Sequence, residues 1–187
     1  MIAIMVDDLP RFFAALSSDR KSFASGQLVF RRDAAVEWLH WIEHGVVHLL
    51  RYQESGGVTV LQRAESGFFL AEASLFSPRY HCDASAVSPS QLVRYPKREV
   101  IAAMRADPEF AAAWAHYLSQ EVQRTRARAE ILSLRRLDDR LDAWLALRDG
   151  IMPQKGGWAG VAREIGVSPE ALYRSLARKR ATMLRSA

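Results

Sequence analysis

Short apolar and alternating segments fill the first half of the chain, whereas the second half has the residue spacing of helices. Between residues 26 and 95, six apolar runs are separated by glycines and a proline. Segments of this length and spacing are typical of antiparallel strands. We therefore predict an antiparallel β-roll with strands at 27–30, 38–42, 46–52, 58–61, 68–70 and 91–95. A short helix is expected before it, with Asp7 or Asp8 as its cap and Pro10 in its first turn.

A long helix is predicted over residues 108–136, which follow the capping residue Asp107 and contain no glycine or proline after Pro108. Arginines crowd its polar side. Its other side has a seam of residues spaced alternately by four and three: Leu118, Val122, Thr125, Ala129 and Leu132. Such a seam needs a partner, and a second copy of the same helix makes the protein a homodimer. The alternative is packing on the chain's own β-roll, in part through Phe110, Trp114 and Tyr117.

The C-terminal segment has the pattern of a helix-turn-helix. After an amphipathic helix at 138–148, a helix is predicted at 158–165, followed by a turn at Gly166 and a second helix capped by Ser168. The small Ala162 permits close helix crossing. One apolar face serves both helices and consists of Val161, Ile165, Val167, Leu172 and Leu176.

The opposite face of the second helix suits the major groove of DNA. Arginine can pair with both acceptors of a guanine, glutamate can accept from a cytosine amino group, and further basic residues can hold phosphates. We expect DNA contacts from Ser168, Pro169, Glu170, Tyr173, Arg174, Arg178 and Lys179. The alternative is that Glu170 and Arg174, four residues apart, form only a surface ion pair.

The charge distribution favours a polyanionic partner. The 187-residue chain has a net charge of +5, but residues 121–187 hold 14 basic and 8 acidic residues, whereas residues 1–120 hold 12 and 13. The basic surplus is therefore C-terminal, where the helix-turn-helix is predicted. A solvated helix face that aids solubility is the simpler explanation of such a surplus.

Composition limits the class of protein. With 49% hydrophobic and 25% charged residues, no basic leader and no apolar run of about 18 residues, we expect a folded cytoplasmic protein without a membrane partner. One cysteine, Cys82, excludes an internal disulfide and an iron–sulfur cluster. Neighbouring strand residues point to opposite faces, which argues against haem or a metal on His81 and Cys82. Glu72 with His81 is too small a constellation for an active site, so we predict no enzyme.

From about residue 20 onward the chain resembles the Crp-Fnr family of bacterial transcription regulators. The matching stretches are GQLVFRRD, WIEHGVVHLLRYQESGGVTVLQ, SGFFLAEASLF, RADPEF, RRLDDRLDAWL and VAREIGVSPEALYRSLARK. The resemblance implies an α+β architecture with a β-roll sensor domain (1–106), a dimerisation helix (107–137) and a helix-turn-helix domain (138–187). It also implies double-stranded DNA, a second copy of the chain and RNA polymerase as partners.

The chain departs from the nucleotide-binding members of that family. Those members hold the ribose with a Gly-Glu pair and the cyclic phosphate with an Arg-Ser or Arg-Thr pair ten residues after the glutamate. Here Ala71 precedes Glu72, and Cys82 and Asp83 stand at the other two positions. A carboxylate repels phosphate, so we predict that cyclic AMP is not the effector. The resemblance places Glu72, Cys82, Asp83 and Thr125 at the effector pocket.

Three further departures concern individual segments. Arg79 follows Pro78 as in the family's phosphate motif, but three residues early. Pro169 replaces the first arginine of the family's Ser-Arg-Glu-x-x-x-Arg recognition helix. The sequence stops at Ala187, so the β-hairpin wing that follows the recognition helix in the family is expected to be absent or truncated.

Two functions are compatible with these patterns. The first is a homodimeric, sequence-specific DNA-binding regulator in which a ligand rotates the DNA-binding domains about a hinge near Leu137 and Asp138. The alternative is a ligand-binding regulatory module that acts on a protein partner without DNA. Specific duplex binding that weakens steeply with salt distinguishes the first from the second.

Overall fold

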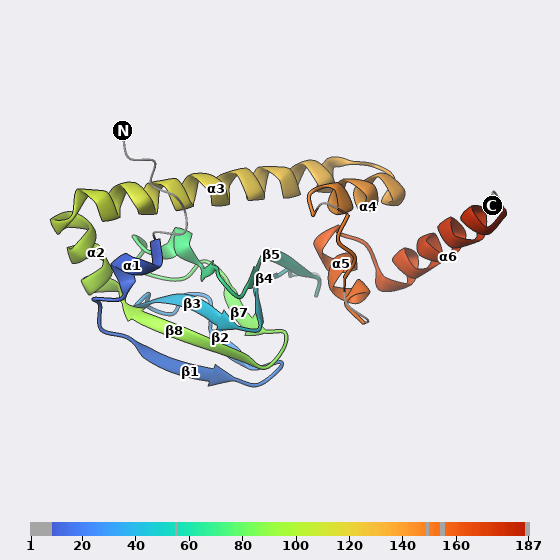
Figure 1. The fold of residues 1–187 in the computed structure, drawn as a ribbon. Coiled ribbons are helices and arrows are strands. Elements are labelled where there is room, and N and C mark those ends of the chain that lie inside the picture. Colours follow the sequence, from blue (N-terminus) through green and yellow to red (C-terminus); the bar gives the residue numbers. More distant parts are fainter. Residues whose placement is uncertain (1–8, 55, 149, 154–155, 186–187) are drawn as a thin grey trace. The chain divides into compact units, whose positions relative to one another are not determined.

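The structure is a computed structural model that describes residues 9–54, 56–148, 150–153 and 156–185, without the side chains of 180–185. The chain divides into two compact units, Met1–Gln120 and Glu121–Ala187. The division falls within α3 (Pro108–Ser133), which Figure 1 draws as one long helix.

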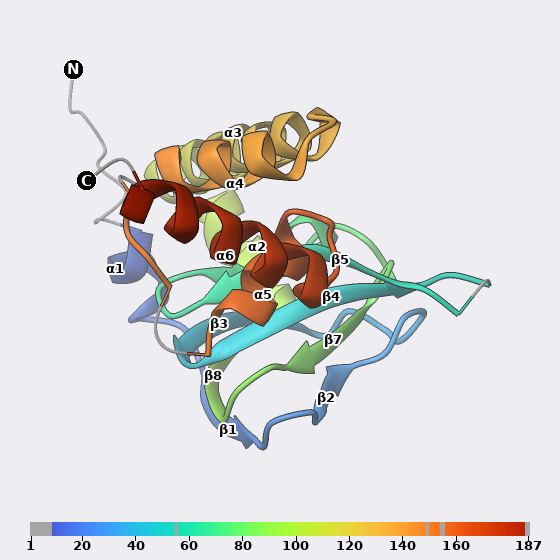
Figure 2. The ribbon, with the colours of Figure 1, turned by 90° about the vertical axis from the view of Figure 1, so that its right-hand side faces the viewer.

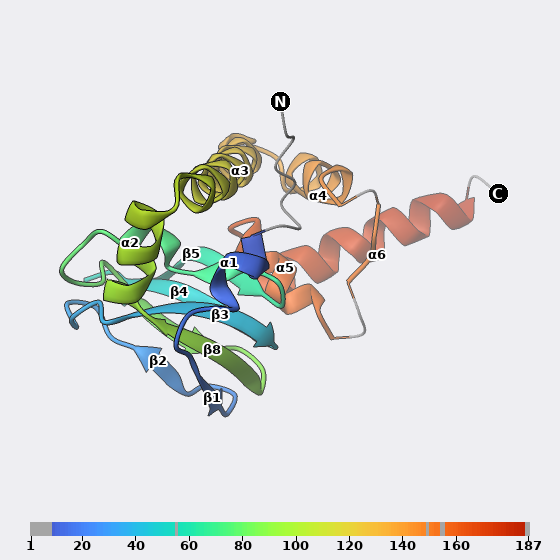
Figure 3. The same cartoon turned by 60° about the vertical axis from the view of Figure 1, so that its left-hand side comes forward.

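Two four-stranded antiparallel sheets form the first unit, so the predicted β-roll is confirmed (Figure 3). The first sheet has the order β1 (Asp19–Phe23), β8 (Ser90–Pro96), β3 (Trp38–His44) and β6 (Phe69–Leu70). The second has the order β2 (Leu28–Phe30), β7 (Asp83–Ala86), β4 (Val46–Tyr52) and β5 (Val58–Glu65). The six predicted strands all overlap observed ones.

Two strands of the sheets were not predicted. β1 has the sequence DRKSF, and only Phe23 in it is buried, so it carries no alternating apolar signal. It is ordered by its partner β8, from the pair Asp19 and Arg94 to the pair Phe23 and Ser90. β7 has the sequence DASA, whose small residues have low strand propensity, yet it lies between β2 and β4 in the second sheet.

Alternation along the strands sends side chains into two cores. In β3, Ile42 enters the core inside the β-roll, whereas Leu39 enters a second core shared with α1 (Leu9–Phe13) and α2 (Lys97–Ala106). The second core also takes Phe110, Trp114 and Tyr117 from the start of α3, as expected. The Tyr117 hydroxyl accepts a 3.0 Å hydrogen bond from the backbone N–H of Phe69.

The long helix begins where it was predicted and ends slightly earlier. Asp107 accepts hydrogen bonds from the backbone N–H groups of Glu109 (2.9 Å) and Phe110 (3.3 Å), which confirms it as the cap. α3 ends at Ser133, three residues before the predicted 136. The Ser133 hydroxyl donates to the Glu130 carbonyl at 2.7 Å, an arrangement that disfavours continued helix. The Asp7 or Asp8 cap predicted for α1 lies outside the described residues.

Three further helices belong to the second unit (Figure 2). They are α4 (Leu137–Ala146), α5 (Trp158–Glu164) and α6 (Pro169–Arg185). Their buried faces meet in one core with Ile131 of α3, and the five apolar residues predicted to face one another on the helix-turn-helix all belong to it. Ala162 is fully buried, as expected for a close helix crossing.

Candidate nucleic-acid interface and effector site

A glycine turn sets the direction of α6. Gly166 has φ of +68°, a left-handed conformation, and a Cβ atom at this position would lie 3.0 Å from Cδ2 of Leu132 and 3.4 Å from Nη1 of Arg140. A larger residue would therefore be strained by its backbone and crowded by its neighbours. This turn separates α5 from α6 as the sequence predicted.

The first turn of α6 is capped as predicted. The Ser168 hydroxyl accepts a 3.2 Å hydrogen bond from the backbone N–H of Ala171, and Pro169 is the first helical residue. Proline has no N–H, so this position makes no backbone hydrogen bond to a phosphate. Ser168 is exposed, and Pro169 is partly buried.

The inner face of α6 is attached to α4 by two polar contacts. Ser175 is only 1% exposed and its hydroxyl donates to the Asp138 carboxylate, which holds the pKa of Asp138 below its ordinary value. One turn further along each helix, Lys179 forms an ion pair with Asp142. Sequence reasoning missed Ser175, because a lone serine between Arg174 and Leu176 gives no periodic signal.

The outer face of α6 is exposed within its unit. Glu170, Tyr173, Arg174 and Arg178 all lie on it, and the Tyr173 side chain is 48% exposed. Glu170 accepts hydrogen bonds from its own backbone N–H and from the Ser168 hydroxyl, which lowers its pKa. Among the described side chains, Glu170 and Arg174 form no ion pair, although the Arg174 charge also lowers the pKa of Glu170. The Arg174 guanidinium is therefore available for an outside partner.

The residue before Glu72 has the left-handed backbone conformation that glycine usually adopts, although it is an alanine. Ala71 has φ of +55° and ψ of +36° and leads into a short 3-10 helix, Glu72–Ser74. Gln62 on β5 holds both residues: its Oε1 accepts from the Ala71 N–H at 3.2 Å, and its Nε2 donates to the Glu72 carboxylate at 2.9 Å. Glu72 is thus fixed by a neighbouring strand.

The residues at the predicted phosphate positions do not form an anion site. Cys82 is buried, and burial raises the pKa of its thiol even though Arg51 lies nearby. A raised pKa argues against a reactive thiolate. The Asp83 carboxylate accepts a 3.1 Å hydrogen bond from the backbone N–H of Arg32. Arg79 donates to the Asp33 carbonyl at 2.6 Å.

The predicted seam of α3 is largely exposed. Val122 and Leu132 are 47% and 39% exposed, and Thr125 and Ala129 are also exposed. Leu118 is partly buried against the aromatic core of the first unit. Thr125 belongs to the second unit and the other three predicted effector residues to the first, so its place in the pocket stays a prediction.

Two absences among the described residues concern metals and membranes. No cluster of three or more histidine, cysteine, aspartate or glutamate side chains is arranged to hold a metal ion there. None of the described helices combines the length and the apolar character that a bilayer crossing requires.

Comparisons with known proteins agree with this geometry. Residues 20–107 match the family model of the cyclic nucleotide-binding domain. The fold is similar to that of FixK2 from Bradyrhizobium japonicum, with a TM-score of 0.77 and 14% identity over 89% of this chain and 86% of that one. It is also similar to the c-di-GMP responsive global regulator CLP of Xanthomonas campestris (TM-score 0.70, 21% identity, 95% and 93% covered).

A third similar structure is a CRP-family transcriptional regulator from Thermus thermophilus (TM-score 0.68, 21% identity, 88% and 86% covered). A sequence comparison with curated proteins gives no match. The resemblance to the Crp-Fnr regulators is thus confirmed: the chain has their fold, and its β-roll matches the cyclic nucleotide-binding domain.

Proposed function

We propose that this chain is a homodimeric, sequence-specific DNA-binding transcription regulator and that α6 reads the major groove. The observation that carries the proposal is the division of α6 into two faces. Leu172 and Ser175 are fully buried on one face, while Glu170, Tyr173 and Arg174 are exposed on the other. In helix-turn-helix proteins the second helix lies in the major groove and contacts base edges with its exposed side chains, which is the role proposed here for this face.

The chemistry of the exposed face fits base edges. An arginine without an intramolecular ion pair can donate two hydrogen bonds to O6 and N7 of guanine. The hydrogen bonds that Glu170 accepts keep it ionised, and a carboxylate accepts from the amino group of cytosine. Ser168, Arg178 and Lys179 flank this pair and suit phosphates, although Lys179 must then leave or share Asp142.

The dimer is proposed from the exposed seam of α3. Val122 and Leu132 expose apolar area that a second α3 helix would cover. Two copies related by a twofold axis would present two α6 helices to half-sites about 34 Å apart, one turn of DNA. A palindromic site is therefore expected.

The sensor is proposed to respond to something other than a cyclic nucleotide. The buried Cys82 and the acidic Asp83 stand where an arginine and a hydroxyl would hold the phosphate, and Arg79 is bonded to Asp33. Ligand binding would act through a hinge near Leu137 and Asp138. Because Asp138 is bonded to Ser175, α4 and α6 would move together at this hinge. RNA polymerase is the further partner, and the cytoplasm the site of action.

Selection of duplexes from a random pool tests this function. The protein is incubated with the pool, and bound duplexes are amplified and sequenced over several rounds. The most enriched duplex is then titrated with the protein at several salt concentrations. Enrichment of a palindrome whose binding weakens steeply with salt supports the proposal. Failure to enrich any sequence, with the protein folded and dimeric, would favour the regulatory module that acts on a protein partner.

A further inference from the structure

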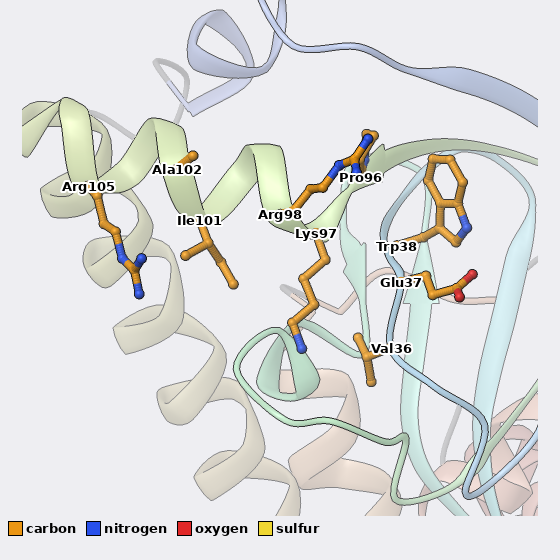
Figure 4. A pocket seen from close by; sticks show the side chains of 9 residues that line it. All are labelled: Val36, Glu37, Trp38, Pro96, Lys97, Arg98, Ile101, Ala102 and Arg105. Carbon is orange, nitrogen blue, oxygen red and sulfur yellow. The ribbon is translucent and has the colours of Figure 1, made fainter.

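The first unit has a pocket whose lining includes none of the residues at the predicted effector site (Figure 4). Its volume is about 640 Å³, and it lies between α2 and the segment that leads into β3. The residues that line it are Val36, Glu37, Trp38, Pro96, Lys97, Arg98, Ile101, Ala102 and Arg105. None of them is Glu72, Cys82 or Asp83.

Hydrogen bonds fix the walls of this pocket. The Lys97 backbone N–H donates to the Glu37 carbonyl at 2.9 Å, which joins the start of α2 to the segment before β3. The Tyr80 hydroxyl donates to the Trp38 carbonyl at 2.9 Å. The Arg94 guanidinium lies 4.6 Å from the centre of the Trp38 ring and covers one face of it. The pocket is therefore largely formed before a ligand arrives.

The α2 wall has apolar residues between basic ones. Arg98, Ile101, Ala102 and Arg105 follow one another at intervals of three, one and three, so they share one face of the helix. The arginines stand at the two ends of this stripe, and both are exposed. Figure 4 shows Ile101 and Ala102 between them on the helix.

The charge of the lining favours an anion. Three cations, Lys97, Arg98 and Arg105, line the pocket with one carboxylate, Glu37. The Lys97 ammonium donates to the Ser77 carbonyl at 2.5 Å, so its charge is held in place. Among the described residues, the side chains of Arg98 and Arg105 form no ion pair and no hydrogen bond. Both guanidiniums can therefore pair with a ligand.

We propose that this pocket binds a hydrophobic carboxylate, a small molecule with an apolar body and one carboxylate head. Val36, Trp38 and Ile101 would contact the apolar body, and Arg98 or Arg105 would bind the carboxylate through its planar guanidinium. The volume falls within the range of about 300–1,000 Å³ typical of small-molecule sites. This inference concerns the first unit alone and does not depend on DNA binding.

Calorimetric titration of the full chain with octanoate tests this inference, with acetate, hexanoate and octan-1-ol as comparison ligands. Affinity should rise from acetate to octanoate, because each added methylene buries more apolar surface. Octan-1-ol should bind more weakly than octanoate. Salt should weaken the binding of octanoate but not that of the uncharged octan-1-ol. Equal affinity for acetate and octanoate, equal affinity for octanoate and octan-1-ol, or no octanoate binding would overturn the proposal.

Variants locate the site. Arg98→Gln and Arg105→Gln should each lower the affinity for octanoate by up to about fivefold, which is the scale of one exposed ion pair. The affinity for octan-1-ol should change little. Arg31→Gln removes another exposed arginine, one that does not line the pocket, and should leave affinity unchanged. Ala102→Trp should fill the pocket and abolish binding, and its thermal transition shows whether it folds. Unchanged octanoate affinity in both arginine variants would place the ligand elsewhere and refute the assignment.

Discussion

The Arg140 guanidinium on α4 donates a 3.0 Å hydrogen bond to the carbonyl oxygen of Ile165, the C-cap residue of α5. It also donates to the carbonyls of Leu134 at 2.7 Å and Gly166 at 3.3 Å. A single cation thus binds the carbonyls after α3 and at the turn before α6. These carbonyls would otherwise lack a partner at the helix ends.

Arg140→Met should therefore destabilise the second unit. The methionine keeps much of the apolar stem but leaves the carbonyl oxygens without a charged donor, at a cost of about 1.5–3 kcal/mol. Urea unfolding followed by far-ultraviolet circular dichroism measures the change. Arg163→Met is the matched control, because Arg163 is an exposed arginine on α5, and its effect should stay within about 0.5 kcal/mol. Equal effects of the two variants would contradict this role of Arg140.

Ala71→Gly should cost much less stability than Ala84→Gly. Both alanines are buried, at 5% and 0% exposure, but Ala71 has a left-handed backbone and Ala84 lies in β7. An alanine held in the left-handed conformation lowers the free energy of unfolding by about 1–2 kcal/mol. Glycine removes this strain but loses a buried methyl group that contributes about 0.8 kcal/mol. We expect the two variants to differ by about 1–2 kcal/mol in urea unfolding. Equal losses would mean that Ala71 is not strained.

Local signals in the sequence predicted much of the architecture. Asp107 before α3 and Ser168 before α6 were both expected to cap, and hydrogen bonds of their side chains confirm it. These predictions succeeded because a cap depends on a few neighbouring residues. The predictions of the alternating strands succeeded for a similar reason, because every second residue of a strand faces the core and is therefore apolar.

The features that were missed depend on partners distant in the chain. β1 is ordered by hydrogen bonds to β8, and β7 by hydrogen bonds to β2 and β4. The residue types of β1 and β7 do not themselves indicate a strand. The Ser175–Asp138 contact joins residues 37 positions apart. The left-handed backbone of Ala71 could not be predicted from an alanine, which avoids that conformation.

His40 should make the stability of the first unit depend on pH. It is buried in the β-roll near Phe30 and Tyr80, its Nδ1 has no hydrogen-bond partner among the described residues, and burial lowers its pKa from 6.5 to about 3. Between these values the unfolded chain binds a proton that the folded chain excludes. Stability therefore rises with pH in this window and falls on acidification, with a slope that approaches about 1.4 kcal/mol per pH unit.

Urea unfolding at pH 4, 5, 6 and 7 checks the sign and the size of this dependence. His40→Leu removes the titrating group and should flatten the curve over this window. His116→Gln changes an exposed histidine on α3 and should leave the slope as it is. A wild-type slope that survives in His40→Leu would assign the pH dependence to other groups.

Val122→Glu should dissociate the proposed dimer. Val122 is 47% exposed on the seam of α3, and a dimer would bury two carboxylates against each other at this position. Sedimentation velocity should show monomers at concentrations where the unmodified protein is dimeric. Gln123→Glu adds the same charge to the neighbouring exposed residue, off the seam, and should leave the dimer intact. A dimer that persists in Val122→Glu would place the interface on another surface.

Arg174→Ala should weaken binding to the selected duplex and relax one base position. The lost contact to guanine is worth about 1–3 kcal/mol on the preferred site, and less on a duplex in which that base pair is already changed. Competition titrations with duplexes altered at one base pair at a time measure both effects. Arg174→Lys keeps the charge but not the planar pair of donors. Compared with Arg174→Ala, it should therefore bind all duplexes more tightly, as a phosphate contact would, without a preference for the base.

Lys179→Ala is the matched comparison from the same helix. If Lys179 contacts a phosphate, its loss should weaken binding to every duplex by a similar factor. The slope of the logarithm of the binding constant against the logarithm of salt concentration should fall in magnitude by about 1. Because Lys179 is paired with Asp142 in the free protein, DNA binding must first loosen that pair, and the effect of Lys179→Ala should be the smaller of the two. If Arg174→Ala instead lowered affinity equally on all duplexes, Arg174 would hold phosphate, and base reading would fall to Glu170 and Tyr173.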